Sequence, residues 1–364
     1  MKNQVSSLLT LLFLSVISPH GYAFELYKDA SSQLNFYGQI RTYFSRLEHQ
    51  DLSLDADSSR AGISGYRNIY GDTQMFVKFE YNLAGNGGNL TNRQHIIGFQ
   101  NPEYGSLSLG RMWTVSDDMP DADYSYAYGD KVKLYKSLTY ASHDSLIKYV
   151  YGNIFTRKKG DFFIATNVGL PENNAPDSSG RKQSLKELFA GYVFRDFKIH
   201  GGYSEGQDKN RTYGASLNNN IKNKYYNASL TYFMNNSQAG LTYNRRDLKK
   251  LNAPVINLKT DSFALAFEHK IKPQWSQNGW FMLYGGYAYQ INESENEVFG
   301  KKNLTSIHSG LQYYFNPSTF VYAEYGWIDG TDICFDNIRG NLTGNKSTNY
   351  SKDSNLELGF RFYW

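Results

Sequence analysis

The sequence lacks several features, and each absence excludes a class of protein. It contains a single cysteine, Cys334, so an intramolecular disulfide framework is excluded. After residue 23, no stretch approaches the ~18 consecutive apolar residues that indicate a transmembrane helix. Lysine and arginine number 38 against 34 aspartate and glutamate, so the net charge of +4 gives no indication of a nucleic-acid partner. Together with the export signal at residues 1–23, these absences leave a secreted protein or a membrane protein built from strands.

Residues 1–23 are typical of a secretory signal peptide. Lys2 precedes an apolar stretch, Leu8–Ile17, that is too short to cross a membrane. The small residues of Gly21-Tyr22-Ala23 suit signal peptidase, so we expect cleavage after Ala23. The mature protein would then be one domain, residues 24–364.

Composition favours the membrane protein built from strands. Aromatic residues make up 16% of the chain, with 31 tyrosines, and there are only 8 prolines. Aromatic residues favour strands and collect at membrane interfaces. Hydrophobic residues are only 40% of the chain, which a barrel with a polar lumen would explain.

The last nine residues, Leu356–Trp364, alternate with a period of two. One face would carry Leu356, Leu358, Phe360, Phe362 and Trp364, and the other Glu357, Gly359, Arg361 and Tyr363. An apolar face that ends on an aromatic carboxy-terminal residue suits a strand that faces lipid and stops at the membrane interface.

Similar alternation recurs along the chain and predicts sixteen strands. The predicted strands are Leu34–Phe44, Ser59–Arg67, Gln74–Leu83, Arg93–Gln100, Ser106–Trp113, Leu138–Gly152, Phe162–Leu170, Glu187–Phe194, Phe197–Glu205, Tyr225–Phe233, Ala239–Arg246, Ser262–Lys270, Trp280–Gln290, Thr305–Phe315, Thr319–Ile328 and Leu356–Trp364. Two alternatives stay open: Arg211–Asn218 could pair in place of a neighbour, and Leu138–Gly152 could be split in two.

Connections between these strands alternate in length. Arg195-Asp196, Asn235-Asn236 and Asn316-Pro317-Ser318 are tight. Glu48–Ser58, Pro171–Ser184, Leu248–Thr260, Ile291–Asn303 and Asp329–Asp353 are long and polar. Short turns at one end and long loops at the other are typical of the periplasmic and extracellular ends of an outer-membrane barrel.

One connection, between Trp113 and Leu138, is too long and charged for a simple turn. It carries Asp117, Asp118, Asp121, Asp123 and Asp130 beside Tyr124, Tyr126 and Tyr128. A loop of this length is usually functional. Folded into a lumen, it would place carboxylates opposite basic side chains of the wall and narrow the passage. The simpler alternative is a solvated acidic loop.

Several motifs resemble the general porins of Gram-negative outer membranes, the trimeric OmpF and OmpC type. They are Glu25–Asp29 before Leu34–Gly38, Ser59–Gly65, Thr91–Arg93 leading to Gly98-Phe99, and Tyr104–Arg111. The resemblance implies an all-β fold: a 16-stranded antiparallel transmembrane β-barrel with an inward-folded third loop. It also implies a homotrimeric channel for passive diffusion of ions and small hydrophilic solutes. The channel would contact outer-membrane lipid and lipopolysaccharide and use no cofactor.

The same resemblance indicates the residues of the pore constriction. Arg60, Arg93 and Lys133 match the family's basic ladder, and Asp118 and Asp121 match the acidic groups of its third loop. Two positions depart from the family pattern. Gln39 stands where the family is often basic, and Ala122-Asp123 replaces a Phe-Gly pair in the loop.

A further departure concerns the contact between subunits. By strand parity Arg111 points out of the lumen, where the family has an arginine that meets a carboxylate on a neighbour's second loop. Here that loop, Ala84–Asn89, has no acidic residue. The resemblance therefore implies that the trimer lacks this latch.

The aromatic residues of the constriction segment support an alternative function. Trp113, Tyr124, Tyr126 and Tyr128 could stack on sugar rings, as in a sugar- or oligosaccharide-selective porin. The tyrosines could equally be packing or girdle residues in so tyrosine-rich a chain.

An enzyme is not expected. His95 and His308 are predicted to face the lumen by strand parity, but the histidines are scattered singly, without metal-ligand spacing or a neighbouring nucleophile. A role as an adhesin or phage receptor would be compatible with the exposed loops and has no sequence signature.

Overall fold

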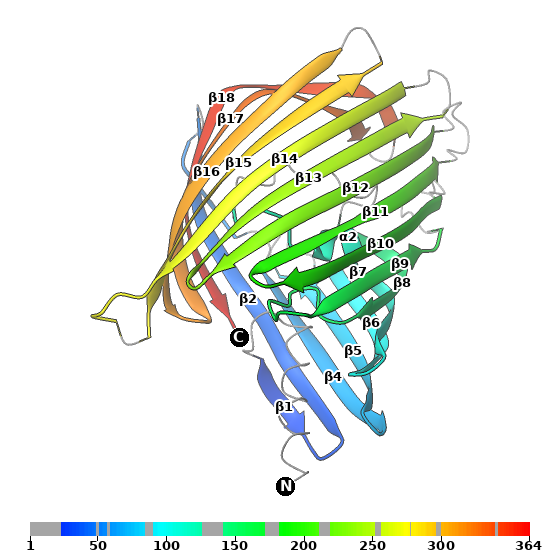
Figure 1. Cartoon of the computed structure of the whole chain (residues 1–364), viewed down its shortest axis with the longest axis vertical. Helices are drawn as coiled ribbons and strands as arrows, with labels where there is room; N and C mark the ends of the chain where they lie inside the picture. Colours follow the sequence, from blue (N-terminus) through cyan, green and yellow to red (C-terminus); the bar gives the residue numbers. More distant parts are fainter. Residues whose placement is uncertain are drawn as a thin grey trace.

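In the computed structural model the strands join into a single closed antiparallel sheet, a barrel whose wall is one strand thick (Figure 1). The structure describes residues 23–48, 51–56, 59–83, 90–125, 141–171, 182–210, 219–251, 256–276, 278–295, 300–338 and 341–364. Within these residues, no helix is long and apolar enough to cross a membrane.

Sixteen strands in the described part of the chain form the barrel wall, as predicted. They are β2 (Ser32–Leu47), β4 (Arg60–Tyr70), β5 (Thr73–Asn82), β6 (Thr91–Asn101), β7 (Gly105–Trp113), β8 (Ser142–Tyr151), β9 (Phe162–Gly169), β10 (Lys182–Phe194), β11 (Phe197–Asn210), β12 (Asn219–Met234), β13 (Ser237–Lys250), β14 (Ile256–Ile271), β15 (Trp280–Ser294), β16 (Lys301–Asn316), β17 (Thr319–Ile338) and β18 (Asn341–Tyr363). Each pairs with the next, and β18 pairs with β2 to close the barrel.

The two faces of the terminal strand confirm the predicted alternation. Leu356, Leu358, Phe360 and Phe362 are 38–50% exposed on the outer face. Asn355, Glu357 and Arg361 are buried on the lumen side. Such an apolar outer face is the surface that a barrel presents to lipid.

Several strands run further than the alternation predicted. The segment Asp329–Asp353, predicted as a long loop, is largely a hairpin of β17 and β18. Beyond the lipid zone the outer face has no need of apolar side chains, so the ladder continues through polar residues that carry no amphipathic signal. The alternative strand Arg211–Asn218 lies outside the described residues.

Two short strands complete the sheet beside β2. β1 (Phe24–Lys28) pairs with Gln33–Phe36, and β3 (Ser53–Asp55) pairs with Tyr43–Ser45. β1 and β18 lie end to end along one edge of β2. Both β1 and the carboxy-terminus are at the lower end of the barrel in Figure 1.

The last contact of the closing β2–β18 ladder involves a glycine. The Gly38 amide donates to the Trp364 carbonyl at 2.9 Å, and the Trp364 amide donates to the Gly38 carbonyl at 3.1 Å. A Cβ at Gly38 would lie 2.6 Å from the backbone carbonyl oxygen of Arg60 and 2.4 Å from Cζ2 of Trp364, so this close approach requires glycine.

Part of the lumen is apolar, contrary to the polar lining expected from composition. One cluster inside the barrel is formed by Val115, Met119, Ile154, Phe163, Ala165, Phe189 and Tyr225. A second is formed by Phe76, Ile96, Met112, Leu146 and Leu185. These clusters fill the side of the lumen against β5–β12 and give the third loop a hydrophobic support.

Candidate functional site

The segment after β7 turns into the barrel and is held there by buried polar groups. It begins with a single helical turn, α2 (Val115–Asp118), whose amino end is capped by the Thr114 side chain. The Val115 amide donates to Oδ1 of Asn167 at 2.7 Å. The amide and hydroxyl of Ser116 donate to the Glu187 carboxylate at 3.0 and 2.7 Å. The loop is therefore inward-folded in its described part, as predicted.

The next residues of the loop are attached to the wall at β11–β13. Asp121 accepts a hydrogen bond from Nδ2 of Asn227 at 2.9 Å, and its Oδ1 lies 3.6 Å from Nε2 of His200. The Ala122 amide donates to the Thr242 hydroxyl at 2.8 Å. Asp121 is thus directed at this wall, on the far side of the loop from Arg60 and Arg93.

Arg60 and Arg93 converge on one buried acid, Glu80. Arg93 Nε donates to Glu80 Oε1 at 3.0 Å, and Arg60 Nε lies 3.8 Å from Glu80 Oε2. Arg93 also donates to Asn82 at 2.9 Å, and its guanidinium lies 4.9 Å from the centre of the Trp113 ring. The two arginines come together as expected, but the carboxylate of Glu80, which was not among the predicted site residues, lies between them.

A bulge in β6 aims Arg93 into the lumen. Glu80 pairs with Gln94 whereas Tyr81 pairs with Asn92, so Arg93 is an extra residue in the ladder. Both Arg93 and Gln94 therefore face inward, and the parity of the strand reverses after them. The prediction that His95 faces the lumen was wrong for this reason: His95 is exposed on the outer face, against the Phe79 ring. His308 is buried on the lumen side, as predicted.

Asp118 faces the wall that carries the arginines. Its carboxylate forms an ion pair with Lys148 of β8, whose ammonium also donates to the Trp113 carbonyl at 3.1 Å. Lys148 was not among the predicted site residues, although its position on the lumen face of β8 followed from strand parity. The remaining predicted ladder residue, Lys133, lies outside the described residues.

The aromatic residues proposed for sugar stacking are only partly described. Trp113 is covered on one face by Arg93. The Tyr124 hydroxyl lies against Gly240, where a Cβ would be 3.1 Å from it, and burial raises the pKa of Tyr124 well above its usual range. Both side chains are thus engaged in packing. Tyr126 and Tyr128 lie outside the described residues.

Two cavities flank the loop inside the barrel. One, of about 320 Å³, lies between the loop and β4–β8 and is lined by Arg60, Glu80, Trp113, Asp118 and Lys148, among others. The other, of about 310 Å³, lies between the loop and β13–β16 and is lined by Asp117, Asp121, Asp123 and Tyr124 together with wall residues. The loop thus narrows the lumen and presents charged groups to the space on each side.

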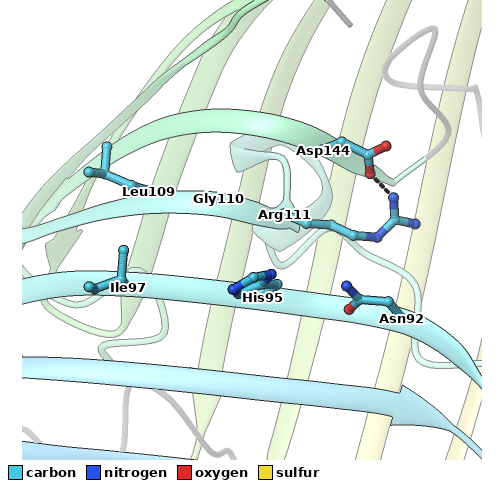
Figure 2. Close-up of a pocket in the computed structure, with 7 residues that line it drawn as sticks. All are labelled: Asn92, His95, Ile97, Leu109, Gly110, Arg111 and Asp144. Carbon is cyan, nitrogen blue, oxygen red and sulfur yellow. Dashed lines mark ion pairs between the residues drawn. The ribbon is translucent and has the colours of Figure 1, made fainter. Parts of the chain in front are cut away.

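A third cavity, of about 600 Å³, is on the outer wall (Figure 2). Arg111 points outward, as predicted, and forms an ion pair with Asp144 on the neighbouring β8 of the same chain. Asp144 and Ser145 of β8 stand opposite the single residue Arg111 of β7, and this one extra residue brings Asp144 to the outer face. The second loop, Ala84–Asn89, lies outside the described residues.

The closed barrel, its lipid-facing outer surface and the charged loop inside the lumen together define a channel-forming outer-membrane protein. Comparison with known proteins agrees. The chain belongs to the Gram-negative porin family, which matches residues 28–351.

Individual relatives cover most of the chain. The outer membrane porin protein OmpD of Salmonella typhimurium (strain 14028s / SGSC 2262) is 24% identical over 344 residues, 85% of this chain and 89% of that protein. In-vitro folded OmpT of Vibrio cholerae, an outer membrane protein, is 31% identical with a TM-score of 0.76, over 94% of this chain and 100% of that one. A structure described as its trimer form is 30% identical with a TM-score of 0.76, over 92% and 100%.

These findings establish the protein's location and general function. It is an outer-membrane porin of a Gram-negative bacterium and forms a water-filled channel for passive diffusion of ions and small hydrophilic solutes. The family consists of channels rather than enzymes. Nothing in the comparisons favours the sugar-selective alternative.

Proposed function

We propose that the loop formed by residues 113–125 is the constriction of this channel, and that Arg60, Arg93 and Asp118 set its ion preference. The position of Asp118 carries the proposal: its carboxylate is on the loop, whereas Lys148 and the two arginines are on the wall. Charges that face one another in a narrow, partly buried passage are screened less than surface charges, so they act on a passing ion.

Asp121 and Lys133 keep their proposed places in this constriction. Asp121 borders the second cavity and would act on ions that pass between the loop and β13–β16. Lys133 remains a proposed third member of the basic ladder. Lysine is a compact point charge without the planar fork of arginine, so its effect on anions would depend on distance alone.

The channel itself is tested by conductance. Folded full-length mature protein, added to a planar bilayer in KCl, should give stepwise increases in current, and the same sample unfolded by heat should give none. Folded protein that inserts into liposomes without allowing ion flow would contradict the channel function.

We also propose a homotrimer that contacts outer-membrane lipid and lipopolysaccharide through its exposed apolar faces. The trimer form of the OmpT relative supports this assembly. Arg111 forms an ion pair with Asp144 of the same chain, whereas the corresponding arginine of the family is expected to pair with an acid on the second loop of a neighbouring subunit. We therefore expect a trimer that dissociates at a lower temperature than relatives with an acidic second loop. Light scattering of the detergent-purified protein decides: a monomer at every concentration would exclude the trimer.

Cleavage after Ala23 is part of the same proposal. It would make Phe24 the mature amino-terminus and the first residue of β1, opposite Phe36. Intact-mass measurement of the protein from outer membranes tests this, and a mass that includes residues before Phe24 would contradict it.

A further inference from the structure

The cavity of about 320 Å³ between the loop and β4–β8 has an apolar wall. Its apolar lining is Phe76, Ile96, Met112, Trp113, Val150, Ile154 and Phe155. Lumen positions of a water-filled barrel are usually polar. The cavity extends from Arg60 and Glu80 at the constriction to Gly152 and Phe155, in the short connection between β8 and β9. Apolar surface on this scale in contact with a passage suits a ligand that is itself partly apolar.

The charged groups that line this cavity leave one cation in surplus. Arg60 pairs with Glu80, and Lys148 pairs with Asp118. The third cation, Lys78, lies 5.2 Å from the centre of the Tyr37 ring. No carboxylate of the described residues forms an ion pair with Lys78, and Glu80, two places along the same face of β5, is already shared between Arg60 and Arg93.

We propose that this cavity binds small amphiphilic organic anions: carboxylates or sulfonates with an apolar body of one or two rings. The proposal rests on the channel function, because such an anion reaches the cavity from the lumen. Lys78 binds the anionic head, and the Phe76, Ile96 and Ile154 side chains contact the body. The volume is at the small end of the ~300–1,000 Å³ typical of small-molecule sites, which limits the body to this size.

The register of β5 fixes the orientation of the ligand. Lys78 and Phe76 are two residues apart on the lumen face, so the head and the body are bound side by side along one strand. The head lies toward the constriction and the body toward Ile154. Because Ile154 also packs against Val115 and Met119 of the loop, a bound anion lies directly beside the narrowest segment and reduces ion current.

The test is block of single-channel current by three matched probes. Naphthalene-2-sulfonate has the proposed head and body, methanesulfonate has the head alone, and (2-naphthylmethyl)trimethylammonium has a similar body with the opposite charge. We expect concentration-dependent block by naphthalene-2-sulfonate, and at least tenfold weaker block by each of the other two.

Substitutions then show which residues bind the blocking anion. Lys78→Gln and Ile154→Ser should each raise the half-blocking concentration of naphthalene-2-sulfonate at least tenfold, and Lys78→Arg should keep it near the parental value. Lys250→Gln is the matched control: it removes a buried lumen-facing lysine on β13, away from the cavity, and should leave the block unchanged. If Lys78→Gln does not fold, isothermal titration of the parental protein and Lys78→Arg in detergent measures binding directly.

The outcomes separate the two proposals. If the channel conducts normally but all three probes block it equally, the anion site is wrong and the channel function stands. The same conclusion follows if naphthalene-2-sulfonate blocks Lys78→Gln and Lys250→Gln equally. Absence of binding in the calorimeter also overturns the site. Absence of conductance before any probe is added contradicts the channel itself.

Discussion

At the scale of single residues, the environment of Glu80 sets the charge of the wall. Its side chain is 5% exposed, and its carboxylate lies between Arg60 and Arg93. The two arginines repel each other, and the negative charge of Glu80 between them reduces this repulsion. The same negative charge also lowers the positive electrostatic potential in the passage. The wall is therefore only partly basic, in contrast to a ladder of unaccompanied arginines.

We expect Glu80→Gln to make the channel more anion-preferring. The substitution keeps the shape of the side chain and leaves the charges of Arg60 and Arg93 uncompensated. The reversal potential in a salt gradient should shift toward anions. The free energy of unfolding should fall by roughly 1.5–3 kcal/mol, the range for hydrogen bonds to charged groups. Glu324→Gln, at a buried lumen acid on β17 that accepts from Tyr284, is the control. An equal shift in both variants would show that Glu80 has no special place.

The residues of the site were predictable to different degrees. The inward direction of Arg60 and Arg93 could be predicted from motifs and strand parity, and that of Asp118 from the loop motif alone; their role in ion selectivity stays a prediction. Glu80, Lys148 and Asn227 carry no motif, and their roles depend on which strands meet across the barrel. His95 was mispredicted because parity counts residues, and the bulge at Arg93 adds one that period-two alternation cannot detect.

At the scale of elements, the short helix α2 is held by groups that lie far away in sequence. Asn167 and Glu187 accept hydrogen bonds from its first two backbone amides. Val115 and Met119 belong to the apolar cluster that includes Ile154, Phe163 and Phe189. A helix of four residues has no stability of its own, so the wall must hold it in place.

Glu187→Ala should therefore loosen the loop without opening the barrel. It removes both acceptors of Ser116 and leaves a buried amide without its partner. We expect more open-channel noise in single-channel records and an unchanged resistance of the barrel to heat in detergent. Glu324→Ala, at an equally buried acid far from the loop, should leave the noise at the parental level. Parental noise in Glu187→Ala would contradict the assigned anchor.

The terminal strand is an element whose last residue matters for assembly. Trp364 makes both final backbone hydrogen bonds to Gly38, and its ring lies 5.9 Å from Phe36. A chain that ends at Tyr363 loses these bonds and an aromatic anchor at the interface, so its level in the outer membrane should fall severalfold. Conductance per channel should not change among the copies that do assemble. Normal levels of the truncated chain would contradict this role.

Strand number and strand faces were predictable because both follow from local alternation. The faces of β18 agree with the predicted alternation from Leu356 to Phe362. The extensions of β17 and β18 through residues 329–353 were missed because polar strands outside lipid carry no such pattern. The apolar clusters inside the lumen were missed because the prediction took inward-facing residues to be polar. An apolar residue on the inward face only interrupts the alternation and gives no sign of its partners.

At the scale of the whole molecule, a uniform barrel wall is made asymmetric by one loop. The loop fills the side of the lumen against β9–β13 and leaves cavities on both of its faces, with basic groups on the β4–β8 wall and acids on the loop. On the proposed assignment, selectivity depends on the loop and the wall together, and neither set of charges alone determines it.

The reversal potential of two double variants tests this account most directly. In a gradient of KCl at low salt, Asp118→Asn with Asp121→Asn should shift the potential toward anions, and Arg60→Gln with Arg93→Gln should shift it toward cations. Both effects should shrink at 1 M salt, where the Debye length falls to ~3 Å. Both barrels should still resist heat in detergent, because substitutions on the lumen face tune selectivity rather than folding. If both variants keep the parental ion preference at low salt, residues 113–125 do not form the constriction.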